Sequence, residues 1–274
     1  MSCLLFNLAI EPLAVALRAS PLRGLPIPGI ADRLVTMLFA DDTTVYLSAD
    51  DDYAVLSGIL ERWCRASCAK FNTLKTEVIP FGSTESRSNV VTNRGQPGRT
   101  LRIPDDVRVL RDGESTRMLG AWIGNHADPT TAWNPVVSRI RANLERWNTR
   151  NVTMHAKKLL VGLELGSRTQ FLAAAQGMPA AIEKELQTIV SRFMWGEGKK
   201  PAIAMSLLHQ SVEEGGLGLL NLTRRNDAIH LMWLSKYLDF QNHRPKWAYL
   251  TDKLFANAAD TPMFPTVSQM TSER

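Results

Sequence analysis

The chain has 274 residues, of which 45% are hydrophobic and 22% charged, a composition that suits one or two domains with buried cores. Its formal net charge of +5 permits nucleic-acid binding without requiring it. Three cysteines provide neither a disulfide framework nor a zinc-binding pattern, and neither a signal peptide nor a long apolar span is present. An intracellular protein without a membrane segment is therefore expected, in the nucleus or the cytoplasm.

Residues 2–13 predict a helix that is apolar on almost every side, which is typical of a helix that is buried or lies under a sheet. Pro12 is expected to kink this helix or to remove one backbone hydrogen bond. Asn7 and Glu11 lie four residues apart and therefore share one face. The proline- and glycine-rich residues 21–31 then predict a linker.

The next segment carries two adjacent aspartates, Asp41 and Asp42, between two runs of strand-forming residues. Side chains alternate through residues 35–40 and again through residues 43–48, which predicts a tight β-hairpin. Aspartate tolerates the unusual dihedral angles of a short hairpin turn, so the pair is expected at the tip. The simpler interpretation is a polar turn. The functional one is a pair of carboxylates on a rigid element, which suits Mg²⁺.

Three more aspartates at positions 50–52 predict the start of the following helix, because acidic residues favour the first turn. Residues 83–104 are polar and basic and predict a surface loop.

Residues 118–125 combine apolar residues with two glycines four positions apart. Leu119 and Ile123 are expected in a core, and Gly120 and Gly124 are expected to permit a bend or a close approach of two backbone segments.

After residue 130 the apolar residues recur at helical spacing, which predicts at least three helices. The first two carry basic residues that could follow a phosphate backbone, although an ordinary solvated helix face explains them equally well. The basic residues proposed for nucleic-acid binding are Arg139, Arg146, Lys157 and Lys158.

Several segments, in this order, resemble the motifs of reverse transcriptases of non-LTR retrotransposons. They are LFNLAIEPL (5–13), FADD (39–42), FNTLKTEVIPFG (71–82), MLGAWIGN (118–125), FMWGEGKKP (193–201), GGLGLLNL (215–222) and NDAIHLMWLSKYL (226–238). The resemblance covers about residues 2–240. It implies an α+β fold in which residues 1–125 form a partial polymerase palm, with the FADD hairpin and packed helices, and residues 126–274 form an all-helical thumb-like region.

The resemblance implies RNA-directed DNA polymerase chemistry with two Mg²⁺ ions, in which Asp41 and Asp42 are catalytic and bind metal. Lys75 matches a lysine near the nucleotide phosphates that is suggested to protonate pyrophosphate, although a solvated surface lysine is the alternative. Asn7 and Gly120 match the nucleic-acid-binding segments, the latter in the hairpin that grips the primer strand. The implied partners are an RNA template, a DNA primer and dNTPs.

In this family a third metal-binding carboxylate lies on an earlier palm strand, upstream of the LFNL helix, and the chain starts inside that helix motif. We therefore expect a polymerase fragment that is inactive by itself. Two other interpretations remain open. In one, the chain is a non-catalytic nucleic-acid-binding remnant with salt-sensitive, metal-independent binding. In the other, it is a helical protein-binding scaffold without nucleic-acid affinity.

Overall fold

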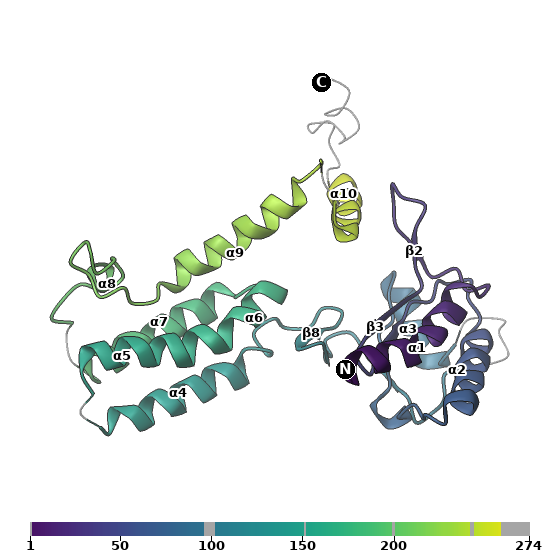
Figure 1. Ribbon diagram of the computed structural model, residues 1–274, viewed down its shortest axis with the longest axis horizontal. Coiled ribbons are helices and arrows are strands. Elements are labelled where there is room, and N and C mark those ends of the chain that lie inside the picture. The colour runs from purple at the N-terminus through teal and green to yellow at the C-terminus, as the bar shows by residue number, and fades with distance from the viewer. Residues whose placement is uncertain (1, 96–101, 151, 199–200, 242–243, 259–274) are drawn as a thin grey trace, which may run out of the picture. The chain divides into compact units, whose positions relative to one another are not determined.

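The protein is described here by a computed structural model that covers residues 2–95, 102–150, 152–198, 201–241 and 244–258 (Figure 1). It combines helices with small sheets, which confirms the α+β class. The chain divides into two compact units, one of Met1–Arg111 with Asp239–Arg274 and one of Asp112–Leu238. The division falls before the boundary expected after residue 125, so residues 112–125 belong to the second unit, and residues 239–274 are grouped with the first.

In the described residues, the first unit contains four α-helices, a short 3₁₀ turn, and paired short strands. Its elements are α1 (Ser2–Arg18), β1 (Leu25–Pro26), β2 (Arg33–Leu34), β3 (Thr36–Phe39), β4 (Asp42–Val45), α2 (Tyr53–Ser67), η1 (Thr73–Lys75), β5 (Glu77–Val78), α3 (Thr84–Asn93) and β6 (Arg108–Val109), and the later α10 (Lys246–Ala258) also belongs to it. The β1–β2 and β3–β4 pairs are antiparallel, and the β5–β6 pair is parallel.

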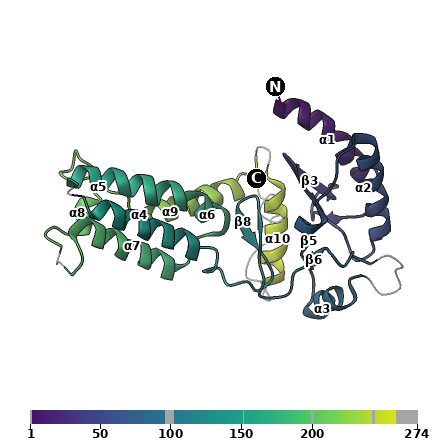
Figure 2. The ribbon, with the colours of Figure 1, turned by 90° about the horizontal axis from the view of Figure 1, so that it is seen from below.

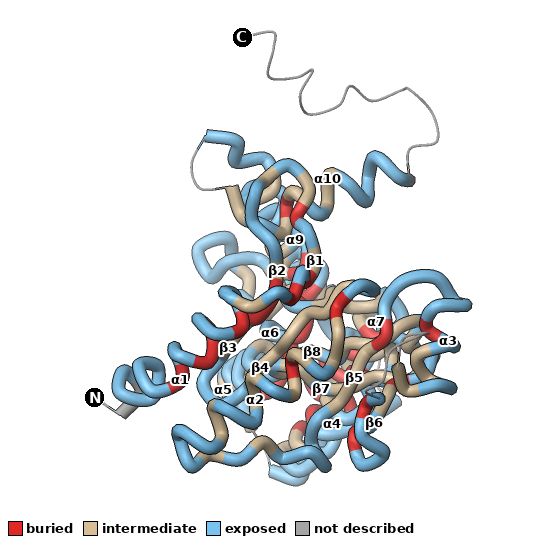
Figure 3. Tube along the Cα trace, turned by 90° about the vertical axis from the view of Figure 1, so that its right-hand side faces the viewer, coloured by how far each residue is buried: buried red, intermediate tan, exposed pale blue. Residues whose placement is uncertain are grey.

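Helix α1 forms as predicted, with Pro12 inside it, but only part of it is buried. Its later turns bury Leu13 and Leu17 against α2 and β3, whereas Leu4 and Leu8 near its start are 70% and 71% exposed. Figure 3 shows the start of α1 in the colour of exposed residues. An all-round apolar pattern therefore predicted the helix correctly and its environment only in part, because burial depends on which neighbours are present.

Residues 83–104 differ from the predicted loop, because α3 occupies residues 84–93. The hydroxyl of Ser83 accepts a hydrogen bond from the Ser86 amide and caps the start of the helix. Arg94 ends it in the left-handed conformation. The capping bond of Ser83 stabilises the start of a helix even in this polar segment. Residues 96–101 lie outside the described part of the chain.

The second unit is a helical bundle preceded by one hairpin. Its elements are β7 (Thr116–Met118), β8 (Ala121–Ile123), α4 (Asn134–Asn148), α5 (Met154–Val161), the π-helical η2 (Gly162–Gly166), α6 (Ser167–Gln176), α7 (Ala180–Trp195), α8 (Met205–Leu208) and α9 (Leu222–Tyr237). The three predicted helices are confirmed. Figure 2 shows α5 and α6 in one line, joined through η2.

The core of this bundle is large and apolar. The side chains of Trp133, Leu186 and Phe193 are almost completely buried in it, together with residues from α4, α5, α6 and α7. Of the helices in the described ranges, none has the length and apolar character needed to cross a bilayer.

Candidate catalytic hairpin and nucleic-acid interface

The FADD segment forms a hairpin with a two-residue turn. Phe39 pairs with Asp42 in the β3–β4 register, so Ala40 and Asp41 make the turn. Ala40 has a φ of 52°, which is the left-handed conformation, and neither aspartate has a positive φ. The expectation that an aspartate takes the unusual dihedral angle is therefore wrong. Alanine in this conformation costs roughly 1–2 kcal/mol relative to its preferred one.

The hairpin presents both carboxylates to solvent. Asp41 and Asp42 are exposed, while Thr36 at the start of β3 is buried and Leu38 packs against the α1–α2 core. Two adjacent exposed carboxylates supply the oxygen donors that a hard cation such as Mg²⁺ prefers. Within the described ranges, no group of three or more His, Cys, Asp and Glu side chains is placed to hold a metal ion. The hairpin thus fits part of a metal site.

The open end of the hairpin is held by bonds between main chain and side chain. The Thr36 hydroxyl donates to the Thr44 carbonyl over 3.0 Å, and the Tyr46 amide donates to the Val35 carbonyl over 2.8 Å. The Tyr46–Val35 bond extends the pairing one step beyond β3 and β4, and the Thr36–Thr44 bond joins the two strands near the same end.

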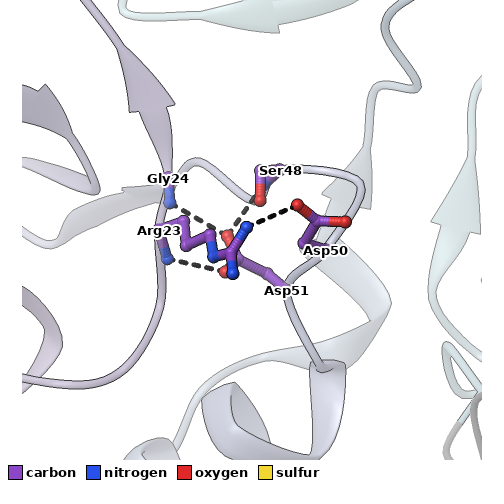
Figure 4. Close-up of polar contacts among 5 residues, drawn as sticks. All are labelled: Arg23, Gly24, Ser48, Asp50 and Asp51. Atoms are coloured by element: carbon purple, nitrogen blue, oxygen red, sulfur yellow. Dashed lines mark hydrogen bonds and ion pairs between the residues drawn. The ribbon is translucent and has the colours of Figure 1, made fainter.

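Asp51 is a buried carboxylate at the base of this hairpin, 6% exposed. Figure 4 shows its polar contacts with Arg23, Gly24 and Ser48. Asp51 accepts hydrogen bonds from the backbone amides of Arg23 at 2.6 Å, Gly24 at 2.9 Å and Ser48 at 2.8 Å. Burial alone would raise the pKa of Asp51, but these donors favour the charged form and the pKa is lowered. The carboxylate therefore ties the linker after α1 to the segment that leaves β4.

The neighbouring aspartates have different roles. Asp50 is exposed and pairs with the Arg23 guanidinium at 2.7 Å, and Asp52 caps α2 by accepting from the Ala54 amide at 2.9 Å. The prediction of a helix start is confirmed for Asp52. The role of Asp51 was missed, because three identical residues in a row carry no sign of which one is buried.

Lys75 and Asn7 are both exposed side chains of the first unit. Lys75 is the last residue of the 3₁₀ turn η1, and Asn7 lies on the exposed part of α1. Neither is hydrogen-bonded to Asp41 or Asp42 within the described residues. The structure therefore leaves both side chains accessible without joining them to the aspartate pair.

The second hairpin, β7–β8, has its turn at Leu119 and Gly120, with φ values of 49° and 90°. A Cβ on Gly120 would lie 2.8 Å from the Phe171 ring, and one on Gly124 would lie 2.0 Å from the Glu114 carbonyl oxygen. The prediction is confirmed as a bend at Gly120, which lies in the turn, and as a close backbone approach at Gly124. The core assignment of Leu119 is wrong, because it lies in the turn and is 43% exposed.

This hairpin is anchored to the bundle of its own unit. The Trp122 amide donates to Oε1 of Gln176 at 2.9 Å, and Phe171 from α6 contacts the turn. Trp122 and Phe171 stay 38% and 57% exposed. The turn thus presents apolar and aromatic surface from a fixed base.

The four basic residues proposed for nucleic-acid binding divide into two pairs. Arg139 and Arg146 are exposed on α4. Lys157 instead donates to the Met194 carbonyl at the end of α7, at 2.9 Å, and its ammonium lies 5.4 Å from the centre of the Phe193 ring. The ammonium of Lys158 lies close to Gly218, 3.2 Å from where a Cβ would stand. The arginines are therefore the more accessible cations.

A second buried carboxylate, Glu164, lies in the π-helical segment of the bundle and was not singled out from the sequence. It accepts from Nδ2 of Asn143 at 2.7 Å and from Nε of Arg168 at 2.8 Å. Burial would raise the pKa of Glu164, but these bonds, and the charges of Arg168 and Arg146, lower it. The cluster joins α4 to the α5–α6 helix.

Compared with models of known protein families, the chain gives no match.

Proposed function

We propose that the chain is part of an RNA-directed DNA polymerase of the non-LTR retrotransposon kind, to which it contributes Asp41 and Asp42. The observation that carries the proposal is the exposed pair of adjacent carboxylates at the turn of a short antiparallel hairpin. The order of the motifs along the sequence supports it. In this proposal the first unit provides palm elements, and the helices of the second unit are thumb-like.

The proposed reaction is in-line attack of a primer 3′-oxygen on the α-phosphate of a dNTP, with release of pyrophosphate. Asp41 and Asp42 would hold Mg²⁺ through their carboxylate oxygens. When bound, Mg²⁺ supplies charge neutralisation and activation of the attacking hydroxyl. Lys75 would donate a proton to the leaving pyrophosphate, for which its exposed ammonium is suited.

In the same proposal, exposed cations and hairpin β7–β8 would hold an RNA template and a DNA primer. Arg139 and Arg146 would contact phosphates, and the turn at Gly120 would contact the primer strand. Asn7 would contact nucleic acid from the exposed part of α1. Lys157 and Lys158 remain in the proposal as weaker contributors, since both ammonium groups lie against the protein.

Primer extension on a primed RNA template, with Mg²⁺ or Mn²⁺, tests the catalytic proposal. The comparison is between the wild type, Asp41→Ala/Asp42→Ala, and Asp227→Ala, a matched loss of an exposed carboxylate on α9. We expect any incorporation to be lost in the double variant and kept in Asp227→Ala. Equal incorporation in all three proteins would contradict the assignment, and no incorporation by folded wild type would agree with the expectation of a fragment that is inactive by itself.

The second candidate function is nucleic-acid binding without catalysis, which the exposed Arg139 and Arg146 on one helix favour. It predicts affinity that falls with salt concentration by a logarithmic slope of about 0.7–0.9 per phosphate contacted. Arg139→Gln/Arg146→Gln should lower that slope by roughly 2, and Asp41→Ala/Asp42→Ala should leave it unchanged. Binding that depends on the aspartate pair and on Mg²⁺ would favour the polymerase proposal instead.

A further inference from the structure

The carboxylate of Asp51 connects the two segments that flank the aspartate hairpin. On one side it accepts from the amides of Arg23 and Gly24, which precede β1, and on the other from the amide of Ser48, which follows β4. The buried side chain of Asp51 thus holds the linker and the exit of the hairpin, and its neighbour Asp52 caps the start of α2.

The linker in turn contacts the entry of the hairpin. Gly24 has a φ of 61°, and a Cβ there would lie 2.3 Å from the Leu34 carbonyl oxygen and 3.1 Å from the Cα of Val35. Val35 directly precedes β3 and is buried. By holding Gly24 and Ser48 with the same Oδ2 atom, Asp51 clamps the chain on both sides of the hairpin base.

We infer that Asp51 is a positioning residue for the Asp41–Asp42 pair, an inference that rests on the proposed polymerase function. The hairpin is short, so the direction of its tip follows the direction of its base. Backbone amides are rigid donors, and a buried carboxylate with several of them has little freedom to move. Asp51 therefore sets where the two carboxylates at the turn stand relative to the α1–α2 core.

The chemistry of the clamp makes Asp51→Asn a sharp test. Oδ2 accepts from two amides and Oδ1 from a third, so every contact requires an acceptor. Asparagine has nearly the same shape but replaces one acceptor by an NH₂ donor, which would face one or two amide donors. Asp50→Asn is the matched control, because it makes the same change on the exposed neighbour.

Hydrogen exchange of the full chain measures the clamp itself. In Asp51→Asn the amides of residues 36–46 should exchange on the order of 10-fold faster, because a buried donor without a partner favours opening. Asp50→Asn should exchange like the wild type, and α7 serves as an internal control from the other unit. Unchanged exchange in the hairpin would overturn the inference. Loss of protection in α2 as well would overturn it too, by showing that Asp51 holds the whole unit.

The affinity for Mn²⁺ distinguishes a positioning role of Asp51 from a role in stability alone. It is measured through the electron paramagnetic resonance signal of the free ion. The relevant sites are those lost in Asp41→Ala/Asp42→Ala. We expect Asp51→Asn to raise the Mn²⁺ dissociation constant of these sites several-fold and Asp50→Asn to leave it unchanged. The dissociation constant of folded protein does not depend on the folded fraction, so an unchanged constant would overturn positioning.

The outcome for the wild type distinguishes the two proposals. If no Mn²⁺ binding depends on Asp41 and Asp42, the metal site of the proposed function fails, and positioning of that site fails with it. The exchange of the hairpin amides would then report only whether Asp51 clamps the hairpin. If Mn²⁺ binds through the pair in both wild type and Asp51→Asn with equal affinity, the metal site stands and Asp51 has no positioning role.

Discussion

The two units of the molecule are stabilised in different ways. The bundle of the second unit buries large side chains, including Trp133 and Phe193, in one continuous apolar core. The main core of the first unit is smaller and mostly aliphatic, built around Leu13, Leu17 and Leu22, and its sheets are two-stranded. A small core leaves a larger share of the structure to polar ties such as that of Asp51. The candidate catalytic pair lies in the unit with less apolar burial.

The largest expected effect is in the bundle. Phe193→Ala should lower the free energy of unfolding of the second unit by about 3–5 kcal/mol, because it opens a cavity in a packed core. It also removes the ring beside the Lys157 ammonium. Hydrogen exchange of α7 and α2 in the same sample would measure it, with faster exchange expected only in α7. The control Phe171→Ala removes a ring that is 57% exposed and should cost much less.

Helix α1 of the first unit carries one buried leucine and one exposed leucine whose substitutions can be compared. Leu13 is completely buried and Leu8 is 71% exposed. Leu13→Ala should lower the stability of the first unit by about 2–5 kcal/mol, whereas Leu8→Ala should change it by less than about 0.5 kcal/mol. Urea unfolding followed by a probe in α2 would measure both. Equal losses would mean that α1 is covered along its whole length, contrary to the structure.

Acid should weaken both units, through different carboxylates. The pKa of Asp51 is lowered on folding, so its stabilisation is fully present above the ordinary aspartate pKa of about 3.9 and is lost as the pH falls through the folded value. The pKa of Glu164 is also lowered, so its stabilisation of the second unit is likewise lost as the pH falls. Asp51→Asn should flatten the acid dependence of the first unit only, and Glu164→Gln that of the second only, as measured by exchange at several pH values.

Salt concentration should affect the stabilisation by Asp51 and by Glu164 to different extents. Asp51 is held by neutral backbone amides, whereas Glu164 is paired with the charged and partly exposed Arg168. Added salt should therefore reduce the contribution of Glu164 more than that of Asp51, because mobile ions screen charge pairs. If the two respond equally to salt, the distinction between amide and guanidinium donors is wrong.

The smallest expected effect concerns the turn of the aspartate hairpin. Ala40→Gly should relieve the left-handed strain of alanine, partly offset by the greater freedom of glycine in the unfolded chain. We expect a net gain in stability of under about 1 kcal/mol, measured as slower exchange of the β3 and β4 amides. Ala40→Val, which adds a branched side chain at the same φ, should instead lose stability.

Much of the local structure was predictable from the sequence because it depends on neighbours in the chain. Alternating side chains predicted the aspartate hairpin, apolar spacing predicted helices of the bundle, and glycine predicted the close backbone approach at Gly124. The hairpin at residues 118–125 was expected from the resemblance alone. Aspartate at position 52 predicted a helix start, since its cap bond reaches only two residues ahead. The position of Asp41 and Asp42 at a hairpin tip follows from the same local pattern.

Other features were decided by residues far away in the chain. Only the tertiary structure shows that Asp51, and not Asp50 or Asp52, is buried, because its donors Arg23 and Gly24 come from a distant linker. The same holds for Lys157, whose partner lies on α7, and for the exposed start of α1. The sequence alone determined many of the elements, though not α3, and where the aspartate pair stands on its hairpin. Burial and polar partners were left to the tertiary structure, because they depend on which distant segments pack together.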